Sequence, residues 1–165
     1  MHSRFFFTRA SFALLSVLFV AIQIQAQSFI RSKNTRAFHA PVLTRVDRVE
    51  LLSIDSRMGE IQKVNETKSI DGNTAQPIAD VWRAQKLTGW SAAACHEPPF
   101  AIKFYSKGKV VLFATICWAC SNITFIVPNR RHWVAFQARS LEGQRLKDIF
   151  INAFPKEPRI ESGLE

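Results

Sequence analysis

The chain has 165 residues, of which 47% are hydrophobic and 21% are charged. This balance is typical of a globular protein and excludes an intrinsically disordered chain. The formal net charge of +9 favours anionic partners such as phospholipid headgroups or anionic polysaccharides. The basic residues recur singly, with Arg130-Arg131 as the only tight pair, so a solvated basic surface is favoured over a nucleic-acid-binding groove.

Residues 1–26 have the pattern of a secretory signal peptide. Arg4 and Arg9 precede an apolar run over residues 11–24, and Ala26 is a small residue suited to cleavage. The run is shorter than the roughly 20 residues of a membrane span. We therefore expect an exported protein, periplasmic or secreted, with no membrane span after cleavage; an uncleaved anchor is the alternative. Cleavage removes two basic residues and no acidic one, which lowers the net charge to +7.

The rest of the chain is predicted to hold one domain. Residues 27–43 are basic and aperiodic, which indicates a flexible lead-in. A single α+β domain is expected over residues 44–155, followed by a polar tail over 156–165. Loose apolar alternation predicts a first strand at 44–54. Residues 56–74 are mainly polar and predict a loop, with a short strand possible near 66–70.

Two helices and a run of strands complete the predicted domain. Apolar residues at helical spacing, among them Trp82, predict a helix over residues 75–87, with Trp82 in the core. Ser140 is a suitable N-cap for a second helix that ends at Pro155. The intervening strands are expected at 100–105, 109–117, 122–127 and 133–136. This order predicts an antiparallel sheet of about four to five strands with two helices packed on one face.

The three cysteines of the chain lie between residues 95 and 120. A two-residue turn at Lys107-Gly108 predicts a hairpin in which Phe104 faces Val111 and Phe100 faces Thr115. Extension of this register places Cys95 opposite Cys120. The hairpin is therefore expected to bring the first cysteine close to Cys117 and Cys120, although the two prolines after His96 can bend the strand.

Three interpretations of this cluster remain open. In an oxidising compartment, Cys95 is expected to form a structural disulfide with Cys117 or Cys120, and this interpretation is favoured. Alternatively, Cys95, His96, Cys117 and Cys120 supply a Cys₃His set that zinc or copper(I) accepts, although adjacent Cys-His residues converge only at a turn. The third interpretation is thiol redox chemistry at the Cys-x-x-Cys sequence. The residues that follow it predict a strand rather than the helix that would lower the thiol pKa.

Residues 82–122 resemble a family of small uncharacterised exported bacterial proteins. The resemblance rests on the Trp82-Arg83 pair, the Cys95-His96-Glu97-Pro98 step, the strand from Ile102 to Tyr105, and a Cys-Trp-x-Cys-x-Asn turn over residues 117–122. It departs from the family pattern at Ala101, where a glycine is expected. The resemblance implies export and a cysteine cluster, and it implies no activity.

These observations favour a non-enzymatic binding or envelope-associated module that is stabilised by a disulfide and needs no cofactor. An anionic envelope component is the expected partner. The alternative is a protein that binds zinc or copper, or carries out thiol redox chemistry, at the cysteine cluster.

Overall fold

The computed structural model describes residues 42–43, 45–57, 59–90, 97–127, 130–157 and 159. Its elements, in chain order, are β1 (Arg48–Arg57), β2 (Glu60–Asp71), the 3₁₀ turn η1 (Gly72–Thr74), α2 (Ala75–Arg83), β3 (Leu87–Trp90), β4 (Phe100–Ser106), β5 (Lys109–Cys117), β6 (Asn122–Val127), β7 (Arg130–Phe136) and α3 (Leu141–Ala153). Residues 1–26, which carry the predicted signal peptide, lie outside the described residues, as do all but Val42 and Leu43 of the predicted lead-in.

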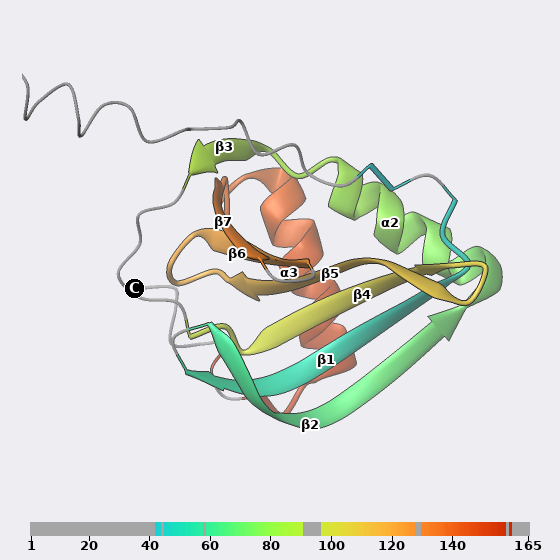
Figure 1. Cartoon of the computed structure of the whole chain (residues 1–165), viewed down its shortest axis with the longest axis horizontal. Coiled ribbons are helices and arrows are strands. Elements are labelled where there is room, and N and C mark those ends of the chain that lie inside the picture. The colour runs from blue at the N-terminus through green and yellow to red at the C-terminus, as the bar shows by residue number, and fades with distance from the viewer. Residues whose placement is uncertain are drawn as a thin grey trace, which may run out of the picture. The chain divides into compact units, whose positions relative to one another are not determined.

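The strands form one seven-stranded antiparallel sheet in the order β2-β1-β4-β5-β6-β7-β3 (Figure 1). The prediction of a sheet of four to five strands is therefore wrong. The two edge strands of the sheet, β2 and β3, account for the difference. β2 runs through the segment predicted as a loop, because an edge strand exposed to solvent needs no apolar periodicity. β3 begins at Leu87, the last residue of the predicted first helix, and continues through residues for which no strand is predicted, since α2 ends at Arg83.

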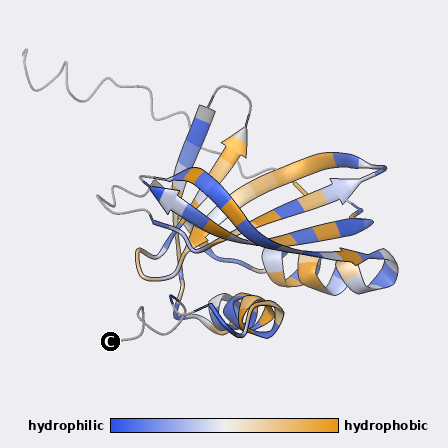
Figure 2. Ribbon diagram, turned by 90° about the horizontal axis from the view of Figure 1, so that it is seen from below, coloured by the Kyte–Doolittle hydropathy of each residue, from blue (hydrophilic) through white to orange (hydrophobic). Residues whose placement is uncertain are grey.

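Both helices pack against the same face of the sheet (Figure 2). From α2, Trp82 lies in the core with its ring centroid 5.4 Å from that of Phe104, as predicted. From α3, Leu146 and Phe150 are fully buried. The predicted cap of α3 is confirmed, because Ser140 accepts a hydrogen bond from the backbone N–H of Gly143 at 3.1 Å. No helix in the described ranges is long and apolar enough to cross a membrane.

The predicted hairpin forms, but its register is wrong by one residue. Near the turn, Tyr105 faces Val110, as expected for a two-residue connection at Lys107-Gly108. A β-bulge then inserts an extra residue into β5, so that Phe104 faces Leu112 and Phe100 faces Ile116. The bulge places Leu112 and Ile116 of β5 on the helix-covered face together with Phe100, Ile102 and Phe104 of β4, whereas the register predicted from sequence would have put them on the opposite face.

Candidate functional site

The second part of the cysteine cluster forms a tight turn between β5 and β6. Cys117 ends β5 in a buried position, and its Sγ accepts a hydrogen bond from the backbone N–H of Cys120 at 3.3 Å. Ser121 has a φ of 50°, in the left-handed region that a sharp reversal requires. Cys117 and Cys120 are not joined to each other by a disulfide.

Trp118 attaches this turn to α3. Its indole Nε1 donates a hydrogen bond to the carbonyl oxygen of Gly143 at 3.1 Å. Its ring lies edge-on to Phe100, Phe136 and Phe150, with centroid separations of 5.7 to 6.2 Å. The turn is therefore held by core packing on the helix side of the sheet.

The other predicted members of the cluster, Cys95 and His96, lie outside the described residues. The predicted disulfide and the predicted Cys₃His metal site accordingly stay predictions. Within the described ranges, no three His, Cys, Asp or Glu side chains lie close enough together to hold a metal ion. The described residues that follow are ordered against β1, where Pro98 accepts a hydrogen bond from the Ser56 hydroxyl at 2.8 Å.

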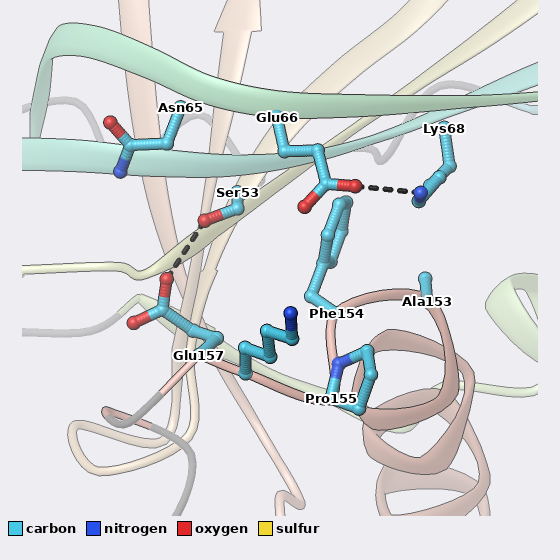
Figure 3. A pocket seen from close by; sticks show the side chains of 9 residues that line it. Ser53, Asn65, Glu66, Lys68, Ala153, Phe154, Pro155 and Glu157 are labelled. Atoms are coloured by element: carbon cyan, nitrogen blue, oxygen red, sulfur yellow. Dashed lines mark hydrogen bonds and ion pairs between the residues drawn. The ribbon is translucent and has the colours of Figure 1, made fainter.

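A cavity of about 420 Å³ lies where the end of α3 meets the first two strands of the chain (Figure 3). Three segments that are distant in sequence contribute side chains to it. Its lining residues are Ser53 from β1, Asn65, Glu66 and Lys68 from β2, and Ala153, Phe154, Pro155, Lys156 and Glu157 from the end of α3 and the segment after it.

The end of α3 is shaped by an aromatic anchor and a proline. Phe154 is almost fully buried, and its ring stacks on Phe100 at a centroid distance of 5.8 Å and an interplanar angle of 15°. Pro155 follows at once, and proline cannot continue a helix without the loss of a backbone hydrogen bond. The chain therefore leaves α3 at a fixed point and returns along β1, which forms one wall of the cavity.

Glu157 fastens this returning segment to the sheet. Its carboxylate accepts hydrogen bonds from Ser53 Oγ at 2.8 Å and from Arg159 Nε at 2.6 Å. Arg159 also makes an ion pair with Asp55 at 3.3 Å. The hydrogen bonds from Arg159, with the bond from Ser53, hold the pKa of Glu157 below its ordinary value. Glu157 and Arg159, predicted to belong to a polar tail, are thus docked on β1.

The charges that line the cavity differ in whether they are already neutralised. Glu157 already accepts hydrogen bonds from Ser53 and Arg159, and Glu66 forms an ion pair with Lys68 at 2.6 Å. Lys156 is exposed and makes no ion pair within the described ranges. A ligand that enters the cavity therefore meets one uncompensated ammonium group beside the apolar atoms of Ala153 and Pro155.

Sequence reasoning missed this cavity. None of its segments carries a motif, because Lys68 lies in the predicted short strand near residues 66–70 and Lys156 begins the predicted polar tail. Comparison with protein-family models, with curated proteins and with solved structures finds no match. The resemblance to small exported bacterial proteins therefore rests on the sequence motifs alone.

Proposed function

We propose that this protein is an exported, non-enzymatic binding module whose cavity at the end of α3 binds a small anionic ligand with an apolar body. The observation that supports this proposal is the position of Lys156, a cation without an ion pair in the described chain, on the rim of a cavity whose carboxylates already have partners. A cavity of this volume lies within the range of about 300–1,000 Å³ that small-molecule sites occupy.

The balance of charge decides the sign of the ligand. A cation would have to compete with Arg159 for Glu157 or with Lys68 for Glu66, whereas an anion can approach Lys156 without breaking an existing pair. The C-terminal end of α3 opposes anion binding, because a helix carries about half a negative charge there. The full charge of Lys156 outweighs this effect, and the net positive charge of the whole chain acts in the same direction.

A fluorescent anion with an aromatic body, 8-anilinonaphthalene-1-sulfonate, is a suitable probe. We expect it to bind the folded protein, and we expect Lys156→Ala to weaken binding about fivefold, since an exposed ionic contact contributes about 1 kcal/mol. Lys109→Ala is the matched control, because Lys109 is also exposed but begins β5 at the hairpin turn. Equal weakening by both substitutions, or by neither, would contradict the proposal.

A second set of probes separates a small ligand from an anionic envelope surface. Vesicles of phosphatidylglycerol and phosphatidylcholine present anionic headgroups without an isolated small molecule. If the partner is a small anion, the soluble probe should show the Lys156→Ala effect while vesicle binding is weak and unchanged by the substitution. If the partner is an envelope headgroup that enters the cavity, vesicle binding should be lost with Lys156→Ala.

The alternative function, metal binding or thiol chemistry, is favoured by one observation at the turn after β5. The backbone N–H of Cys120 donates a hydrogen bond to Cys117 Sγ at 3.3 Å, so the turn holds the two ends of the Cys-x-x-Cys sequence close together, and this is the spacing of paired cysteine ligands in zinc sites. With Cys95 and His96, these residues would complete a set that suits zinc or copper.

Intact mass under non-reducing conditions, combined with thiol alkylation and metal analysis, distinguishes the outcomes for the cysteines. A mass two hydrogens below the reduced value with one alkylated thiol and no metal indicates a structural disulfide. A bridge from Cys95 would close a loop of roughly 25 residues and stabilise the fold by about 3 kcal/mol. Three thiols with one equivalent of zinc or copper would instead assign the turn to a metal site.

A further inference from the structure

The outer border of the sheet is formed by β2, a long strand with an open edge (Figure 1). Within the described ranges β2 pairs only with β1, and ten of its 12 residues are exposed. Its free N–H and C=O groups can pair with another extended chain, and natural edge strands usually prevent such pairing with charged side chains. The positions of the charges on β2 therefore decide what can pair with it.

The hydrogen-bond phase of β1 shows which residues of β2 face outward. The backbone N–H of Ile54 donates to the carbonyl oxygen of Pro99 at 2.9 Å, so the backbone groups of Ile54 and of Leu52, two residues earlier, point toward β4. Leu52 faces Thr67 on β2. This pair is consequently not hydrogen-bonded, and the N–H and C=O of Thr67 point away from β1 into the open edge.

The sequence around Thr67 is complementary to itself when a second copy runs antiparallel. With a two-fold axis at Thr67, the two Thr67 residues exchange both backbone hydrogen bonds. Glu66 of each copy then faces Lys68 of the other, so that opposite charges meet on both sides of the axis. Sliding one copy by two residues in either direction keeps the backbone hydrogen bonds. One direction, however, places Glu66 opposite Glu66, and the other places Lys68 opposite Lys68.

The local geometry of β2 allows this pairing. Its two register shifts against β1 lie before Glu66, whereas the run from Glu66 to Asp71 pairs with β1 without interruption. The side chains of Glu66 and Lys68 are 51% and 49% exposed, so both can reach a partner. We infer that two copies of this chain pair antiparallel along β2 about an axis at Thr67, which joins their sheets into one continuous sheet.

Charge reversal with compensation tests the pairing directly. Light scattering should find a dimer for the unaltered chain at micromolar concentration. Lys68→Glu places like charges opposite each other twice, and it should raise the dimer dissociation constant at least tenfold. The double variant Glu66→Lys with Lys68→Glu restores opposite charges and should recover the dimer. An unaltered chain that stays monomeric up to 1 mM, or a double variant no better than the single one, would overturn the inference.

A disulfide trap measures the register independently. Residues in a hydrogen-bonded antiparallel pair have Cα atoms about 5.5 Å apart, which suits a disulfide. Thr67→Cys should therefore crosslink two chains on mild oxidation. Ser69→Cys is the matched control, because residue 69 would lie about 14 Å from its counterpart, four residues along the strand. Equal crosslinking by the two variants, or none by Thr67→Cys, would reject the axis at Thr67.

Discussion

The docking of the chain after α3 depends on Glu157, and Glu157→Gln tests how strongly. The substitution keeps the size of the side chain and removes the charge that Ser53 and Arg159 bind. The Glu157 side chain is only 9% exposed, which makes its hydrogen bonds stronger than those of a surface pair, whereas the Arg159 side chain is 38% exposed and partly screened. We therefore expect the free energy of unfolding to fall by about 1–2 kcal/mol, more than the loss of a surface ion pair and less than the loss of a fully buried charged hydrogen bond.

Urea denaturation with a constant m-value measures this change. Glu60→Gln is the matched control, because Glu60 forms an exposed ion pair with Arg131 away from the cavity, and such a pair contributes less than about 0.5 kcal/mol. The pH dependence adds a second check. The pKa of Glu157 is lowered by folding, so its contribution is complete above the unfolded pKa and is lost as the pH falls through the lower folded pKa. The difference between the unaltered chain and Glu157→Gln should therefore shrink in acid. A Glu157→Gln variant as stable as Glu60→Gln at neutral pH would refute the docking.

Two further substitutions test the contact between α3 and the turn after β5. Gly143→Ala should lower the free energy of unfolding by about 1–3 kcal/mol despite the better helix propensity of alanine, because the added Cβ would lie 2.6 Å from the backbone oxygens of Gln137 and Ala138. Thermal unfolding checks this, and a rise in the melting temperature would contradict it. Trp118→Phe keeps an aromatic ring but removes the hydrogen bond to Gly143, and it should destabilise the protein by about 1 kcal/mol in the same assay. A loss above about 3 kcal/mol would indicate a packing defect rather than a lost hydrogen bond.

The cysteine turn and the cavity are connected through α3. Trp118 binds the start of this helix at Gly143, and Phe154, at its end, forms part of the cavity. Both aromatic rings also contact Phe100 in the core. Oxidation or metal binding at the cysteines is therefore expected to stabilise the helix on which the cavity depends. Titration of the sulfonate probe before and after thiol reduction would measure that coupling, since reciprocal linkage requires any effect on affinity to appear in both directions.

Local sequence signals were sufficient for several elements. The serine cap of α3, the tight turn at Lys107-Gly108 and the burial of Trp82 each depend on neighbouring residues or on a helical period, and the structure confirms them. Tertiary structure decided the remainder. β2 forms a strand because β1 supplies its hydrogen bonds, although most of its own residues are polar. The bulge at the start of β5 is set by packing of both strands against the helices, and no turn rule contains it. The cavity joins β1, β2 and the end of α3, so its chemistry exists only after three distant segments have folded together.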